Sequence, residues 1–86
     1  MKIEFANGVE KTLKKLGSTA QRAIILYLDE ISRLEDPRSR GKALVGNMAG
    51  FWRYRVGDYR MVCRIVDDEM IVYVLKVGHR REVYSD

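Results

Sequence analysis

The sequence contains a single cysteine, Cys63, and a single histidine, His79, among its 86 residues. One cysteine cannot form an internal disulfide. The two residues together also fall short of the four ligands that a structural zinc ion normally takes. We therefore expect a chain without a disulfide, a bound metal or another cofactor, which folds in a reducing compartment.

Long apolar runs and helix breakers are also scarce. No run approaches the roughly 20 apolar residues that span a bilayer, and the first residues, MKIEF, lack the apolar core of a signal peptide. One proline and seven glycines are too few for extended linkers. These absences predict one domain over residues 1–86, located in the cytoplasm.

The net charge of +4 arises in the second part of the chain. Residues 1–36 contain six basic and six acidic side chains, whereas residues 37–86 contain ten basic and six acidic ones. Eight of those ten are arginines, whose planar guanidinium groups suit bidentate contact with phosphate. The imbalance indicates a polyanionic partner, and a solvated surface that favours solubility is the alternative.

The first half of the chain has mostly helical periodicity. Residues 2–5 alternate as in a short strand, and apolar side chains then recur at helical spacing over 9–16 and 19–34. Gly17 separates the two helices, and Asp36-Pro37 ends the second, because a residue before proline is driven out of the helical region. The short connection predicts an antiparallel helix pair.

The second half changes to period two. Three runs rich in β-branched and aromatic residues, 51–56, 59–66 and 70–77, are joined by short polar connections, which predicts an antiparallel meander. Residues 38–50 have no period and are expected to form a loop with an edge strand near 43–45. The predicted fold class is α+β in the order β-α-α-β-β-β, with an N-terminal strand and an antiparallel two-helix hairpin packed on one face of an antiparallel sheet.

Strand alternation separates apolar from basic side chains. The apolar set, which includes Trp52, Tyr54 and Cys63, is expected to pack on the helices. The basic set then lies on the opposite face and consists of Arg53, Arg55, Arg60 and Arg64. Neighbouring cations repel each other, so the cluster calls for a bound anion such as an RNA backbone. The alternative is open solvent with counter-charges from Asp58, Asp67 and Glu69.

The last predicted strand delivers His79, Arg80 and Arg81 to the end of the sheet, and Tyr84 follows within reach. We expect the arginines of the sheet to lie around this histidine and tyrosine. Histidine titrates near neutral pH, which makes His79 a candidate general acid or base. Taken singly, a histidine such as His79 more often has a structural or surface role, and a tyrosine such as Tyr84 more often serves in packing.

Four segments, taken in order and spacing, resemble the RelE/ParE toxin superfamily over nearly the whole chain. They are the junction Leu16-Gly17-Ser18, the loop GKALVG at 41–46, the run WRYRVGDYR at 52–60 and the ending VGHRREVY at 77–84. The resemblance implies a small sheet with a helical hairpin on one face. It also implies a RelE-type toxin of a type II toxin–antitoxin system, an mRNA interferase that cuts mRNA in the ribosomal A site and inhibits translation. The implied partners are a cognate antitoxin protein, the ribosome and mRNA.

The resemblance also assigns roles to positions that match the family's motifs. The expected catalytic residues are Arg60, His79, Arg80 and Tyr84. The expected RNA-binding residues are Arg53 and Arg55, which match the family's basic strand positions, together with Arg64, Arg81 and Lys42, which we add because they are basic side chains of the same half of the chain. The best-known RelE enzymes carry lysine where this chain has Arg53 and Arg55. Arginine stays protonated in proteins, so these two side chains can bind phosphate but are poor general bases.

The expected reaction is metal-free attack of the ribose 2′-hydroxyl on the adjacent phosphorus, with Arg60 and Arg80 holding the phosphate. Three alternatives remain open. A ParE-like toxin would inhibit DNA gyrase without cutting RNA. A non-catalytic nucleic-acid-binding module would keep the basic sheet and lose only affinity on mutation of His79. A degenerate toxin would retain only the binding of its antitoxin.

Overall fold

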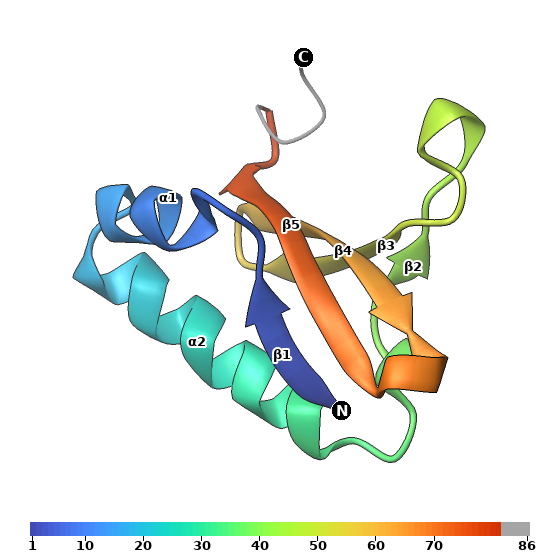
Figure 1. Cartoon of the computed structure of the whole chain (residues 1–86). Helices are drawn as coiled ribbons and strands as arrows, with labels where there is room; N and C mark the ends of the chain where they lie inside the picture. Colours follow the sequence, from blue (N-terminus) through green and yellow to red (C-terminus); the bar gives the residue numbers. More distant parts are fainter. Residues whose placement is uncertain (82–86) are drawn as a thin grey trace.

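Two helices lie on one face of a five-stranded sheet, in the computed structural model that describes residues 1–81 (Figure 1). The predicted α+β class and element order are confirmed. The elements are β1 (Lys2–Phe5), α1 (Val9–Lys15), α2 (Ser18–Arg33), β2 (Lys42–Ala43), β3 (Trp52–Val56), β4 (Tyr59–Val66) and β5 (Ile71–His79). Neither helix in this part of the chain is long and apolar enough to cross a membrane.

The strands lie in the order β1-β5-β4-β3-β2. β3, β4 and β5 form the predicted antiparallel meander, and β2 is a two-residue edge strand paired with Trp52 and Arg53. β1 runs parallel to β5, so the sheet is mixed rather than wholly antiparallel. The two helices separate β1 from the meander, so no hairpin turn forces an antiparallel pairing on β1.

The core lies between the helices and one face of the sheet. Its buried members come from α1, α2, β3, β4 and β5, and they are Val9, Leu13, Ile24, Leu28, Ile31, Tyr54, Met61, Cys63, Val72, Val74 and Val77. The predicted inward positions of Tyr54 and Cys63 are confirmed, and Trp52 packs against this core. Burial raises the pKa of the Cys63 thiol to about 12, so Cys63 acts as a small apolar side chain.

A β-bulge interrupts the alternation of β5. Val62 of β4 pairs with Lys76, but its neighbour Cys63 pairs with Val74, so β5 carries one extra residue at this point. Before the bulge, Val72 and Val74 face the core, and after it Val77 does. The bulge therefore reverses which side chains of β5 face the helices, and it turns His79 to the same side as Val77.

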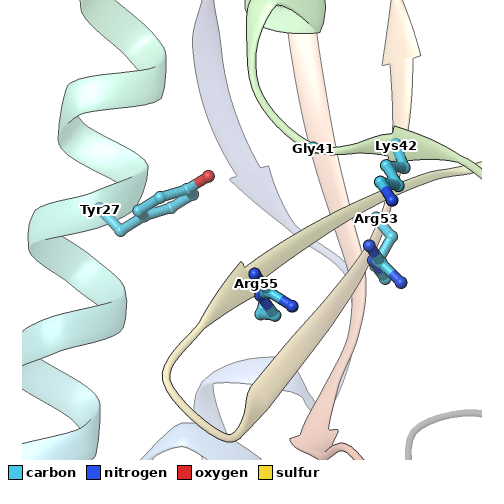
Figure 2. Close-up of a pocket in the computed structure, with 5 residues that line it drawn as sticks. All are labelled: Tyr27, Gly41, Lys42, Arg53 and Arg55. Carbon is cyan, nitrogen blue, oxygen red and sulfur yellow. The ribbon is translucent and has the colours of Figure 1, made fainter.

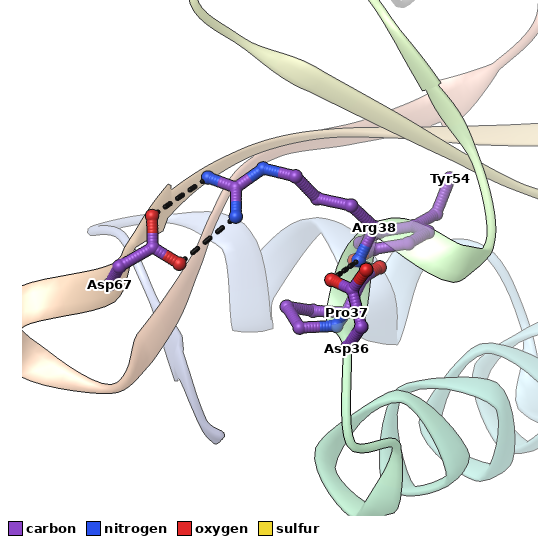
Figure 3. A network of polar contacts seen from close by, with 5 residues as sticks. All are labelled: Asp36, Pro37, Arg38, Tyr54 and Asp67. Atoms are coloured by element: carbon purple, nitrogen blue, oxygen red, sulfur yellow. Dashed lines mark hydrogen bonds and ion pairs between the residues drawn. The ribbon is translucent and has the colours of Figure 1, made fainter.

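The segment before β2 is fastened along the outer edge of β3. The Tyr54 hydroxyl donates a 2.6 Å hydrogen bond to the Pro37 carbonyl, and Trp52 Nε1 donates a 2.8 Å bond to the Arg40 carbonyl. Arg38 forms a bidentate pair with Asp67 at 2.9 and 3.0 Å, which ties the segment to the β4–β5 connection (Figure 3). These contacts hold Gly41 and Lys42 beside β3.

We expect Tyr54→Phe to lower the free energy of unfolding by about 1–2 kcal/mol, because it leaves the buried Pro37 carbonyl without its hydrogen-bond donor. Chemical denaturation followed by circular dichroism measures the change. The matched control is Tyr73→Phe, which removes an exposed hydroxyl bond to Glu69. Equal effects of the two substitutions would show that the Pro37 bond does not stabilise the fold.

The Arg38–Asp67 pair predicts a pH dependence of stability. Hydrogen bonds from Arg38 hold the pKa of Asp67 below its ordinary value of 3.8. A lowered carboxyl pKa stabilises the fold above the ordinary value, and this contribution is lost as the pH falls through the lowered value. Asp67→Asn should therefore lower the urea midpoint at about pH 7 and leave it unchanged at about pH 2. Asp68→Asn is the control, and an equal loss in that variant at neutral pH would contradict the assignment.

Candidate nucleic-acid interface

The sheet face opposite the helices, here called the open face, carries three rows of side chains across neighbouring strands. Strand pairing places Arg55 opposite Arg60, and Arg60 opposite Gly78. A second row contains Lys42, Arg53, Val62 and Lys76, each paired with the next. In the third row, the Arg64 guanidinium lies 5.4 Å from the centre of the Phe51 ring, and Arg64 pairs with Tyr73.

The predicted gathering of Arg53, Arg55, Arg60 and Arg64 on one face is therefore present. Like charges directly opposite each other destabilise a sheet, and this face has two such pairs, Arg55 with Arg60 and Lys42 with Arg53. The face therefore has an electrostatic reason to bind an anion.

One of the counter-charges that the alternative interpretation requires, Asp67, is held by a cation outside the arginine cluster. Asp67 pairs with Arg38, and Glu69 accepts a 2.9 Å hydrogen bond from the Tyr73 hydroxyl. Within residues 1–81, Arg53 and Arg55 take part in no ion pair. With Asp67 held by Arg38 and no carboxylate paired with Arg53 or Arg55 among the described residues, the cluster favours binding of an external anion over a simple solvated face.

A cavity of about 230 Å³ lies at the edge of β3. Figure 2 shows Tyr27 of α2 reaching toward this edge, where the side chains of Lys42, Arg53 and Arg55 gather. The Arg53 Nε–H is buried and has no hydrogen-bond partner among the described residues. An unpartnered donor in a cavity lined by three cations suits an anionic group such as phosphate. Sequence reasoning missed Tyr27, whose position beside Leu28 at the margin of the apolar helix stripe was its only signal.

Arg60 is oriented by the turn that joins β3 to β4. Its Nη1 donates to the carbonyls of Gly57 at 3.1 Å and Tyr59 at 3.2 Å. Arg80 follows β5, is exposed, and donates its backbone N–H to the Asp58 carbonyl at 2.8 Å. Two of the expected catalytic arginines are thus anchored at the same turn, although Arg80 is held there through its backbone.

His79 lies away from the arginines of the open face. Its imidazole is edge-on to the Tyr59 ring at 6.1 Å, and it lines a cavity of about 570 Å³ together with residues of the α1–α2 region such as Leu16 and Ala20. The expectation that the arginines surround His79 is therefore wrong. The β5 bulge is the reason, because simple alternation cannot reveal an inserted residue.

The remaining expected residues are placed as follows. Lys42 and Arg64 lie on the open face, in its second and third rows. Arg81 is exposed after β5, and its backbone N–H donates to His79 Nδ1 at 3.4 Å. Tyr84 lies outside the described residues. Within residues 1–81, no three histidine, cysteine, aspartate or glutamate side chains are close enough to hold a metal ion together.

Comparison with known proteins identifies the family. A family model described as "ParE toxin of type II toxin-antitoxin system, parDE" matches residues 3–84. The chain belongs to the RelE/ParE toxin family. It is 33% identical over 87 residues to the mRNA interferase toxin RelE of Escherichia coli K12, covering 98% of this chain and 90% of RelE. It is 31% identical over 83 residues to toxin RelG of Mycobacterium tuberculosis, covering 95% and 93%.

Solved structures of the family confirm the fold. The toxin-antitoxin complex RelBE2 from Mycobacterium tuberculosis contains a chain that superposes with a TM-score of 0.82 at 31% identity. The match covers 92% of the present chain and 96% of the chain in the RelBE2 complex. The resemblance inferred from the sequence segments is thereby confirmed, and this chain is a toxin of the type II toxin–antitoxin class.

Proposed function

We propose that this toxin is a RelE-type mRNA interferase, a ribosome-dependent and metal-free endoribonuclease that cuts mRNA in the A site and so inhibits translation in the cytoplasm. The observation that carries the proposal is the open face, where Arg53, Arg55 and Arg60 meet in adjacent rows. The similarity to a protein named mRNA interferase over nearly its full length supports it.

The proposed reaction uses the RNA's own 2′-hydroxyl as nucleophile. The 2′-oxygen loses its proton and bonds to the adjacent phosphorus, and the bond from phosphorus to the 5′-oxygen breaks as that oxygen gains a proton. The products are one RNA ending in a 2′,3′-cyclic phosphate and one beginning with a 5′-hydroxyl. Arg60 and Arg80 neutralise the extra negative charge on the phosphorane, while Arg53 and Arg55 hold the flanking phosphates.

His79 remains the proposed general acid or base, since histidine is the side chain that titrates near neutral pH. Because His79 lies away from the open face, the RNA must also reach the end of β5 for this role. We expect His79→Gln, which keeps a polar side chain of similar size, to slow cleavage by about 10²-fold or more. Cleavage rates on purified ribosomes measure the effect. Cleavage at the wild-type rate would assign proton transfer to another group.

A protein antitoxin is the proposed inhibitor of this toxin. The similar Mycobacterium tuberculosis structure is a toxin-antitoxin complex, and we extend that kind of partner to this chain. The second candidate function is inhibition of DNA gyrase, favoured by the matching family model, whose description names ParE. The arginine-rich open face favours the ribonuclease, because it supplies phosphate contacts and transition-state charge neutralisation.

The two functions predict different first events in cells that express the toxin. Pulse-labelling with radioactive methionine and thymidine follows protein and DNA synthesis after induction. We expect methionine incorporation to stop first, and the Arg60→Ala variant to restore it. Thymidine incorporation that stops first, with translation continuing, would reject the ribonuclease in favour of the gyrase inhibitor.

A further inference from the structure

A second hollow lies on the open face, beyond the arginine rows. Its volume is about 650 Å³. Aromatic, aliphatic and charged side chains from β4, β5, the β4–β5 connection and the residue before β3 line it, namely Phe51, Arg64, Val66, Glu69, Tyr73 and Leu75. Unlike the cavity at the edge of β3, its walls are largely apolar, so a phosphate group alone does not fit its chemistry.

Two features of this groove match a nucleobase. The Arg64 guanidinium over the Phe51 ring, 5.4 Å from its centre, forms a cationic and aromatic stack, and bases of unpaired RNA stack on both kinds of group. Glu69, which also lines the groove, accepts a hydrogen bond from Tyr73. A carboxylate in the wall disfavours phosphate and can accept from the amino group of a base such as cytosine.

The groove lies one row along the sheet from the proposed phosphate contacts. Arg64 stands two residues along β4 from Val62, whose row contains Arg53 and Lys76. Two residues of a strand span about 7 Å, so a strand of RNA that crosses the Arg53 row can turn a neighbouring base into the groove. Positive charge beside an apolar floor is the combination that single-stranded nucleic acid requires.

We infer that this groove binds one unstacked base of single-stranded RNA, next to the phosphates held by Arg53 and Arg55. The inference rests on the proposed function for the identity of its ligand, and it adds a base-binding subsite. Phe51 and Arg64 supply the stacking surface. Glu69 supplies selectivity for a base with an exocyclic amino group.

The test is fluorescence anisotropy with a labelled eight-nucleotide RNA in which every ribose is 2′-O-methylated, so that it cannot be cut. In a series of otherwise identical RNAs, each has one base removed at a different position. The position whose loss weakens binding identifies the bound base. We expect one abasic position to weaken binding to wild type by about tenfold. Phe51→Leu keeps an apolar side chain but removes the ring. It should weaken binding to the intact RNA by the same factor as the abasic position does for wild type, and the abasic position should then have no further effect.

Two controls complete the design. Val45→Ala removes an apolar side chain that is 82% exposed in the loop before β3, and it should leave binding unchanged. Glu69→Gln should reduce the preference for cytosine over uracil at the sensitive position. Failure of wild type to bind the RNA, equal sensitivity at every abasic position, or a Phe51→Leu variant that binds as Val45→Ala does would each overturn the inference.

The outcomes separate this inference from the proposed function. Binding that shows one sensitive position and depends on Phe51 supports the groove even when ribosomes yield no cleavage, a result that would reject only the endoribonuclease. Cleavage on ribosomes with a Phe51→Leu variant that binds RNA normally would retain the endoribonuclease and reject the groove. A Phe51→Leu variant that loses affinity only for a protein partner would also reject it.

Discussion

Replacing Arg60 with alanine is expected to slow the cleavage of ribosome-bound mRNA by about 10²–10³-fold, the usual effect of removing one donor that stabilises transition-state charge. Arg60 lies in the row nearest the β3–β4 turn, between Arg55 and Gly78. The carbonyls of Gly57 in the turn and Tyr59 at the start of β4 orient its guanidinium. Because Gly78 presents no side chain, Arg60 and Arg55 are the cations that this row offers to a phosphate.

The measurement is the single-turnover rate of cutting on purified ribosomes at saturating toxin. Arg33→Ala is the matched control, because Arg33 is an exposed arginine of α2 that pairs with Asp29, apart from the open face. Loss of one positive charge is common to both variants. A rate for Arg60→Ala equal to that of Arg33→Ala would show that Arg60 does not stabilise the transition state.

Replacing Gly41 with alanine is expected to lower the free energy of unfolding by about 3 kcal/mol, since it combines backbone strain with a clash. Gly41 has a φ of +83°, a conformation that side chains disfavour. An added Cβ would lie 2.3 Å from the Arg53 carbonyl oxygen and 2.6 Å from Trp52 Nε1. The segment must move away from β3, which breaks the Trp52 bond to the Arg40 carbonyl.

Gly46→Ala provides the control for this substitution. Gly46 also has a positive φ, +65°, but nothing lies within 4 Å of an added Cβ. Gly46→Ala should therefore lower the free energy of unfolding by about 1 kcal/mol, from backbone strain alone. Denaturant unfolding of both variants isolates the clash at Gly41. Equal midpoints for the two variants would mean that the segment before β2 is not held against β3 as described.

Much of the fold could be predicted from the sequence because its periods are clear. The apolar stripe of α2 places Ile24, Leu28 and Ile31 in the core, and alternation along β3 places Tyr54 inside and Arg53 and Arg55 outside. The gathering of arginines on one face follows from these patterns and from the two-residue turn between β3 and β4. None of this depends on contacts between distant parts of the chain.

The position of His79 could not be predicted, because it depends on one extra residue in β5. Pairing Cys63 with Val74 rather than with Leu75 reverses the remaining strand, and the sequence of β5 is apolar on both sides of that point. The parallel pairing of β1 with β5 also could not be predicted from the sequence, since it joins the two ends of the described chain. The cavity beside Tyr27 forms only when α2 and the edge of β3 come together.

The proposed function has the arginines of the open face holding the phosphates of mRNA while it is cut on the ribosome. Its most direct test adds the purified toxin to ribosomes stalled on a reporter mRNA with an empty A site, and maps the RNA ends by primer extension. We predict a cut within the A-site codon, with a 2′,3′-cyclic phosphate on the upstream fragment, that disappears when Arg53, Arg55 and Arg60 are all alanine. Intact mRNA with the wild-type toxin, or cutting that persists in the triple variant, would contradict the account.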